Sequence, residues 1–282
     1  MLLSTRTLRP KTGTRRRPAP GEVGVGRRRG ARGVSLIVAL ALLLIAVPAA
    51  LAQGPGCNGQ PAVAEGVRLC VPPGLASGLT GRREARVAEE VPGAREAHRL
   101  LTLLGYPVAS PLNQPVLAVF ALADFDQPGA HLAPDVRALR RVLADRPPFR
   151  ERGALPPDTV NLPTLIMEAA TPFLARPLYL DLPWGSGVRG VGATGQDLSP
   201  LFHGDIQYLF AGTSSDGRWL VVAAFPLSAP DVPRVSEESL DRDSDGAIAV
   251  VHRHLSLLDE TRYNPALTTL DDLLRTLAIE GP

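Results

Sequence analysis

Three aspartates at alternate positions, Asp241, Asp243 and Asp245, form the sharpest chemical pattern in the sequence. Calcium prefers several oxygen ligands in one tight loop, and carboxylates at loop positions 1, 3 and 5 followed by a glycine at position 6 provide them. The twelfth position, which should offer a bidentate carboxylate, is His252. The pattern therefore predicts a weak, incomplete calcium site. The alternative is a solvated acidic turn in which Asp245 caps a helix that begins near Ala247.

A second metal candidate is the pair formed by His252 and His254. On a strand, this spacing places both imidazoles on one face, which suits a zinc site. The apolar series in this region predicts a helix instead, in which the two side chains point about 200 degrees apart. No cysteine or glutamate stands where it would complete the ligand set. Calcium is therefore the only cofactor that the sequence suggests.

Hydrolytic chemistry would need a nucleophile, a base and an orienting acid, and Ser186, His203 and Asp205 supply these residue types. No Gly-x-Ser-x-Gly elbow surrounds Ser186. The run from Gly185 to Gly190 has the spacing of a dinucleotide-binding loop, but we expect no helix after it to bind a pyrophosphate. We interpret this run as a hairpin turn with a flexible loop. A secreted hydrolase is kept as an alternative function.

The first 52 residues have the organisation of a secretory signal. Nine arginines and one lysine precede an apolar stretch from Val34 to Val47, and Ala50 and Ala52 then offer a small-residue cleavage site. The apolar stretch is shorter than the about 20 residues that span a membrane. We therefore predict a cleaved signal over residues 1–52 and a secreted or extracytoplasmic protein over residues 53–282. A retained membrane anchor is the alternative.

Removing the predicted signal reverses the net charge. Ten of the 30 basic residues and one of the 28 acidic residues lie in residues 1–52, so residues 53–282 carry 20 arginines against 27 acidic residues, a formal charge of −7. A surface of this sign repels nucleic acid phosphates, and we expect no nucleic acid partner. Residues 53–282 also contain no lysine. This absence excludes Gly-Lys-Ser/Thr phosphate loops, Ser-x-x-Lys acylating pairs and lysine Schiff bases.

The two cysteines, Cys57 and Cys70, both follow the predicted signal. In an oxidising compartment we expect them to form a disulfide, which would tie the N-terminus of the exported chain to a first strand near Val67 to Val71. The alternative is a lipid on Cys57, although Gly54-Pro55-Gly56 is a poor lipobox. Apart from that lipid or an uncleaved signal, nothing in the sequence predicts contact with a membrane.

Hydrophobic periodicity predicts the remaining elements. Helical spacing is found over residues 132–144 and in two C-terminal segments that Asn264-Pro265 separates, and a buried strand is expected over residues 116–122. Residues 206–210 and 219–225 flank turn formers and predict a hairpin, whose Tyr208 and Trp219 we assign to the core. The sequence therefore predicts one α+β domain, an α/β sandwich in which a mainly antiparallel sheet is flanked by helices.

The hairpin segment from Ile206 to Val221 resembles the signature of an uncharacterised family of exported bacterial proteins. That signature is Phe-Gln-Gly-Leu-Thr-x-Asp-Gly followed by two tyrosines and a valine, and this chain departs from it at Ala211, Ser214, Trp219 and Leu220. The resemblance spans most of residues 115–280. The ending around residues 277–279 also resembles, more weakly, that of PsbP-like sandwiches. The family implies export and no particular activity.

The leading functional hypothesis is therefore a non-catalytic extracytoplasmic module for binding or interaction. A secreted hydrolase and a weakly calcium-binding surface protein are the alternatives. We predict that Ser186, His203, Trp219 and the Asp241 loop would lie around one cavity in an enzyme and lie apart in a binding module.

Overall fold

The computed structural model describes residues 57–87, 96–109, 113–127, 129–130, 132–149, 173–193 and 206–281. Contacts between residues divide the chain into two units, Met1–Leu51 and Ala52–Pro282, and every described residue belongs to the second unit. The signal segment predicted over residues 1–52 lies outside the described residues, and so do His203 and Asp205 of the predicted catalytic set.

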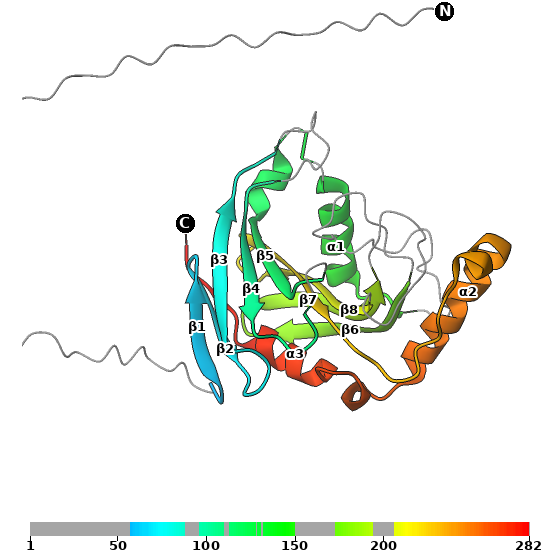
Figure 1. The fold of residues 1–282 in the computed structure, drawn as a ribbon. Helices are drawn as coiled ribbons and strands as arrows, with labels where there is room; N and C mark the ends of the chain where they lie inside the picture. The colour runs from blue at the N-terminus through cyan, green and yellow to red at the C-terminus, as the bar shows by residue number, and fades with distance from the viewer. Residues whose placement is uncertain are drawn as a thin grey trace, which may run out of the picture. The chain divides into compact units, whose positions relative to one another are not determined.

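Two antiparallel sheets form the framework (Figure 1). The larger sheet has seven strands in the order β3-β4-β5-β9-β8-β7-β6. Its strands are β3 (Gly78–Glu84), β4 (His98–Leu104), β5 (Val116–Ala121), β6 (Leu174–Leu182), β7 (Gly185–Ala193), β8 (Ile206–Ser214) and β9 (Trp219–Pro226). The smaller sheet has the order β1-β2-β10, from β1 (Gln60–Ala64), β2 (Val67–Val71) and β10 (Ala278–Ile279).

Five helical segments join these strands. They are the 3-10 helices η1 (Leu122–Asp126) and η2 (Glu260–Arg262) and the α-helices α1 (Ala133–Asp145), α2 (Glu237–Leu257) and α3 (Leu267–Arg275). The predicted single α+β domain with a mainly antiparallel sheet and flanking helices is confirmed. No helix in the described residues combines the length and the apolar composition that crossing a membrane requires.

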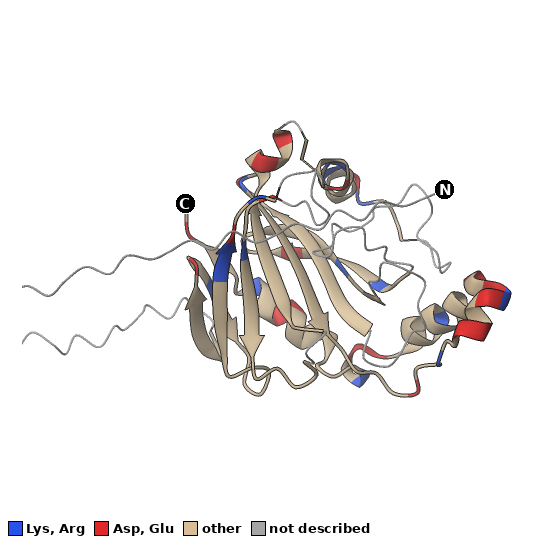
Figure 2. Ribbon diagram, turned by 45° about the horizontal axis from the view of Figure 1, so that its top comes forward, with Lys and Arg blue, Asp and Glu red and all other residues tan. Residues whose placement is uncertain are grey.

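Both faces of the large sheet are buried, because different elements cover them. Helix α1 packs against β7 and β8 on one face, where Leu139 meets side chains such as Leu209 and Val222. Helix α3 and the small sheet cover the other face, where Leu270 joins the cluster that contains Val221. Figure 2 shows α1 and α3 on opposite sides of the strands. Alternate residues of one strand therefore enter different cores, and the central strands are apolar at nearly every position.

The β8–β9 hairpin is confirmed, although β8 continues to Ser214 and the turn occupies residues 215–218. A short network closes this turn. The Ser214 hydroxyl donates to Asp216 Oδ1 at 2.6 Å, and the Arg218 guanidinium donates to Asp216 Oδ2 at 2.7 Å. These hydrogen bonds lower the pKa of Asp216 to about 2.

We expect the stabilising effect of the Asp216 carboxylate to depend on pH. Because the pKa of Asp216 is depressed in the folded state, its contribution is fully present above the unfolded value of about 3.9 and is lost as pH falls toward 2. The Tm of the wild type should therefore exceed that of Asp216→Asn at pH 5, and the two should converge by about pH 2. A difference in Tm that stayed constant over this range would contradict the expectation.

The interpretation of Gly185 to Gly190 as a turn with a flexible loop is wrong, because β7 begins at Gly185 and this run forms its first six residues. The glycines accommodate close side-chain packing. The ring of Phe210 lies where a Cβ of Gly187 would be, and Leu174 Cγ is 2.5 Å from the position that a Cβ of Gly190 would occupy. Glycine therefore serves here as space for neighbouring side chains.

Candidate functional site

The most concentrated group of buried ionisable side chains surrounds Arg189, which is 0% exposed. Its Nη2 donates to Glu260 Oε1 at 2.5 Å, its Nε lies 3.5 Å from Asp271 Oδ1, and its Nη1 donates to the Arg176 carbonyl oxygen at 2.9 Å. Tyr208 donates its hydroxyl hydrogen to Asp271 Oδ1 at 2.7 Å. We call these five residues the Arg189 network. The network joins β6, β7, β8, η2 and α3.

Strand geometry explains why the side chains meet. Tyr208 lies opposite Val191 in the β7–β8 ladder, so it is a diagonal neighbour of Arg189 on the same face. The β6 ladder is irregular between Ala175 and Leu178, and Arg176 adopts a positive φ of 53° there. At this bulge Arg176 contacts the network twice. Its carbonyl oxygen accepts a hydrogen bond from Arg189, and its side chain donates to Glu260 Oε1 at 3.1 Å.

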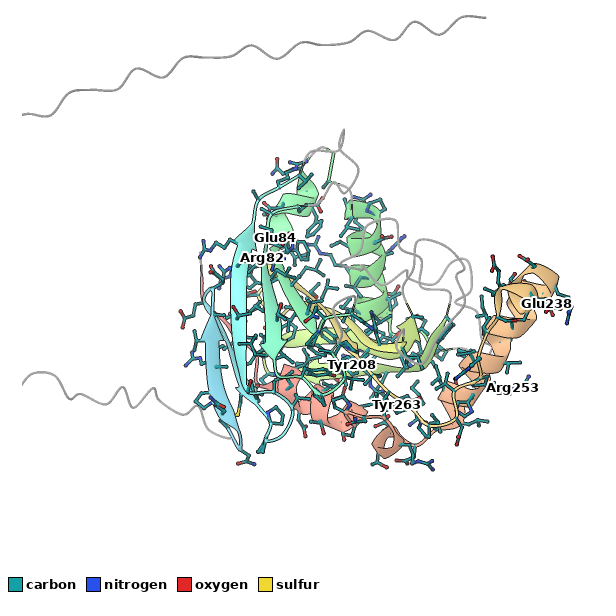
Figure 3. All side chains as sticks on the ribbon, in the orientation of Figure 1. Arg82, Glu84, Tyr208, Glu238, Arg253 and Tyr263 are labelled. Atoms are coloured by element: carbon teal, nitrogen blue, oxygen red, sulfur yellow. A yellow bond between two sulfur atoms is a disulfide. The ribbon has the colours of Figure 1, made fainter. Side chains whose placement is uncertain are left out.

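Helix α3 places Asp271 on its buried side, one turn beyond Leu267. The hydroxyls of Tyr208 and Tyr263, both labelled in Figure 3, donate to Asp271 and to the Leu255 carbonyl respectively. The two tyrosines come from different elements, yet both carry a buried hydroxyl with an acceptor. The network therefore fastens η2 and α3 to the sheet through polar contacts inside an otherwise apolar interface.

Burial and neighbouring charges together determine the pKa values of the network residues. Burial raises the pKa of Asp271, and it raises the pKa of Tyr208 well above the usual range, with the nearby Asp271 charge adding to the effect. Burial also opposes ionisation of Glu260, but the hydrogen bonds and charges of Arg189 and Arg176 outweigh it and lower the Glu260 pKa. Arg189 thus keeps its counter-charge, and Tyr208 remains a hydrogen-bond donor.

Three of the five residues, Arg189, Tyr208 and Asp271, cannot reach a substrate in the observed arrangement, whereas the side chains of Arg176 and Glu260 are 32% and 26% exposed. Arg189 and Tyr208 are each 0% exposed and Asp271 is 4% exposed, so their polar atoms face one another and not solvent. Apart from Arg189 Nε, which makes an ion pair with Asp271 but no hydrogen bond within the described residues, the buried polar atoms of these three side chains have partners within the protein. Breaking a buried pair of this kind by removing one partner is costly. The geometry supports a structural role for the Arg189 network.

Ser186 lies on β7, opposite Asp181 on one side and Thr213 on the other. It is partly exposed. Its predicted partners His203 and Asp205 are outside the described residues, so the structure does not place the three together. Tyr208 and Trp219, which we assigned to the core, are 0% and 7% exposed, and this prediction is confirmed.

The predicted calcium-binding residues occupy a kinked helix. Asp241, Asp243 and Asp245 all lie within α2, whose helical conformation is interrupted at Asp243 (φ −159°, ψ 84°). Asp243 Oδ1 accepts a hydrogen bond from the Gly246 backbone N–H at 2.9 Å and so caps the second half of the helix. The prediction that Asp245 is the capping residue is wrong by two positions. Among the residues that the structure describes, no three His, Cys, Asp or Glu side chains form a group that could hold a metal ion.

Replacing the cap should weaken this helix. We expect Asp243→Ala to lower the free energy of unfolding by about 1 kcal/mol, because the Gly246 N–H loses its acceptor. Asp241→Ala is the matched control, since Asp241 is exposed on the same helix, and it should cost less than about 0.5 kcal/mol. Urea denaturation of both variants measures the difference. Equal losses would show that Asp243 does not act as a cap.

His252 and His254 contact different parts of the molecule. The His252 ring lies edge-on to Phe173, and burial lowers its pKa although a hydrogen bond with the Leu174 backbone partly opposes this effect. His254 Nε2 lies 2.9 Å from the Pro230 carbonyl oxygen. The predicted helix is confirmed at this position, and the two imidazoles serve separate packing contacts.

Cys57 and Cys70 form a disulfide with a Cα–Cα distance of 5.6 Å, as predicted. The bridge joins the segment before β1 to β2. Because its sulfur is bonded to that of Cys70, Cys57 has no free thiol for a lipid in this structure.

Sequence reasoning missed a second buried polar corner, where β3 ends and β4 begins. The His98 ring stacks on Phe120 with centroids 4.7 Å apart, its Nδ1 is 2.9 Å from the Glu96 carbonyl oxygen and its Nε2 is 3.6 Å from Glu84 Oε2. On the other face of β4, the Arg99 guanidinium lies 4.8 Å above the Trp219 ring. Neither contact was apparent in the sequence, because the paired residues come from different strands.

The chain matches none of the protein families, curated proteins or solved structures with which it was compared. The resemblance of the β8–β9 hairpin to exported bacterial proteins stays a prediction.

Proposed function

We propose that this chain is an exported, extracytoplasmic interaction module that performs no catalysis and binds a protein partner through helix α2. The outer side of α2 carries the proposal. Val250 and Leu257 are 55% and 79% exposed, and their spacing of seven residues places them on one side of the helix, two turns apart. Large apolar side chains aligned on an exposed helix face are typical of a binding surface.

The charge of the same helix suggests the chemistry of the partner. Its first half exposes Glu237, Glu238, Asp241 and Asp245 and includes one arginine, Arg242. Figure 2 shows these acidic positions at the free end of the helix, and Figure 3 labels Glu238 there. A complementary partner would place an apolar patch against Val250 and Leu257 and basic side chains against the acidic half.

Two further observations support the compartment and the absence of catalysis. The disulfide between Cys57 and Cys70 is a type of bond that persists outside the reducing cytosol. The acid, base and hydroxyl groups of the Arg189 network are committed to one another in the core. Those groups contribute to stability, and the outer side of α2 binds the partner.

Site-specific photo-crosslinking tests the proposal. A photoreactive amino acid at position 257, in the producing cells, should give one cross-linked product of discrete mass, and added salt should weaken it because the contact is partly electrostatic. The matched control is position 63, since Val63 is 51% exposed on β1. Equal products from both positions, or a product at twice the mass of the chain, would overturn the proposed partner. Covalent labelling of Ser186 by a fluorophosphonate probe would overturn the absence of catalysis.

A further inference from the structure

Strand β1 buries very little of its own surface. Gln60, Pro61 and Val63 are exposed, and only the small side chains of Ala62 and Ala64 are partly buried against the core. In the described residues its one hydrogen-bonded strand neighbour is β2, with which it pairs from Gln60–Val71 to Ala64–Val67, and Ala64 also packs against Gly81 of β3. A two-stranded hairpin without a hydrophobic face is marginally stable. Apolar burial therefore contributes little to the docking of β1.

Strand β2 is held in a different way. Val67, Leu69 and Val71 are 0%, 1% and 1% exposed in the main core. Its other edge pairs with β10, and the Cys70 backbone N–H donates to Thr276 Oγ1 at 2.9 Å. These contacts fix β2 independently of β1. The two strands of one hairpin thus differ sharply in how strongly the rest of the molecule holds them.

Beyond the β1–β2 ladder and the packing of β1 against β3, one ion pair and one covalent bridge retain the β1 segment. The exposed ion pair between Arg83 and Glu65, at 3.0 Å, lies at the turn that follows β1, and exposed pairs of this kind contribute little. The other is the disulfide, which fixes Cys57, three residues before β1 begins, to Cys70 on β2. The covalent bridge holds the N-terminal end of the strand to β2.

We propose that β1 is an oxidation-dependent strand, which docks on β2 when the Cys57–Cys70 disulfide forms and leaves β2 when the disulfide is reduced, while the rest of the domain stays folded. A dithiol reductant breaks the Sγ–Sγ bond, each cysteine sulfur gains one electron and one proton, and the dithiol is oxidised to a cyclic disulfide. Formation of the bridge is the reverse step, in which a disulfide oxidant takes up the two electrons and two protons and is reduced to two thiols. The inference goes beyond the proposed function, because it does not depend on any partner of α2. It implies that β1 is undocked in the reducing cytosol and completes the small sheet after export.

Amide hydrogen exchange of the full chain, with and without dithiothreitol, tests the inference. In the reduced protein the amides of β1 should exchange at least about tenfold faster, whereas those of β5 and β9, and that of Cys70, which donates to Thr276 and not to β1, should change less than about twofold. Cys57→Ser should reproduce the reduced pattern without any reductant. Glu65→Gln is the matched control, since it removes the ion pair with Arg83 and keeps the disulfide, and β1 should stay protected.

Three results would overturn the inference. Unchanged protection of β1 after reduction would show that its ladder suffices. Equal loosening of β1 and of the Cys70 amide would show that the hairpin opens as one unit. Loss of protection throughout the chain would show that the disulfide holds the whole fold and not one strand.

Discussion

Arg189→Leu should lower the free energy of unfolding by about 3–5 kcal/mol, the largest loss that we expect from one substitution in this protein. The leucine would leave the carboxylates of Glu260 and Asp271 in the core without the cation that lies between them. Arg176 would still pair with Glu260 and Tyr208 would still donate to Asp271, but the buried Asp271 carboxylate would lose the cation that lies 3.5 Å from it. Denaturant unfolding followed by circular dichroism measures the loss.

A matched surface pair provides the control for Arg189→Leu. Arg275 donates to Asp272 at 2.7 Å, and their side chains are 49% and 65% exposed. Because exposed pairs contribute about 0–1 kcal/mol, Arg275→Leu should cost far less than Arg189→Leu. Adding Asp271→Asn to Arg189→Leu should recover part of the loss, since it removes one of the stranded charges. Similar losses for the two arginine variants would refute the structural role of the Arg189 network.

Gly187→Ala should destabilise the domain by roughly 1–3 kcal/mol, the second largest effect that we expect. A Cβ at this position would meet the ring of Phe210 and would lie 2.8 Å from the Ala211 carbonyl oxygen. The ring is 1% exposed and has little room to move, so β7 and β8 would have to separate. Gly281→Ala is the control, because no atom lies within 4 Å of a Cβ at that position.

A double-mutant cycle identifies the cause of that loss. In a Phe210→Ala background the ring is absent, so Gly187→Ala should cost clearly less than it does in the wild type. The Ala211 carbonyl would remain close, and a smaller residual cost should persist. If Gly187→Ala cost the same in both backgrounds, the close approach of the ring would not be the reason for the glycine.

The sequence predicts those parts of the fold in which the pattern lies within one contiguous segment. Helix α1 and the β8–β9 hairpin follow from apolar spacing and turn residues over a dozen or so positions, and both are confirmed. Strand β3 was missed because Gly78, Gly81, Arg82 and Arg83 weaken its alternation. Its identity as a strand depends on pairing with β4, which is a tertiary contact.

The Arg189 network could not be predicted, since it joins residues more than sixty positions apart. The sequence nevertheless contains one indication of the network at Arg189 and one at Asp271. Arg189 lies between the apolar residues Val188 and Val191, and Asp271 lies between Leu270 and Leu273 on the apolar side of a predicted helix. Two charges of opposite sign at positions that should be buried are a reason to expect a buried pair. The sequence contains no information on the distance between them.

The bulge in β6 affects whether neighbouring molecules can pair through their sheet edges at high concentration. Strand β6 is one of the two outer strands of the large sheet, and Pro177 lies within its irregular stretch and has no backbone N–H to donate. The other outer strand, β3, carries the adjacent charges Arg82 and Arg83. Both edge strands of the large sheet thus oppose the strand pairing between molecules that leads to fibrils. The large sheet can therefore stay separate from those of neighbouring molecules even when the protein is concentrated.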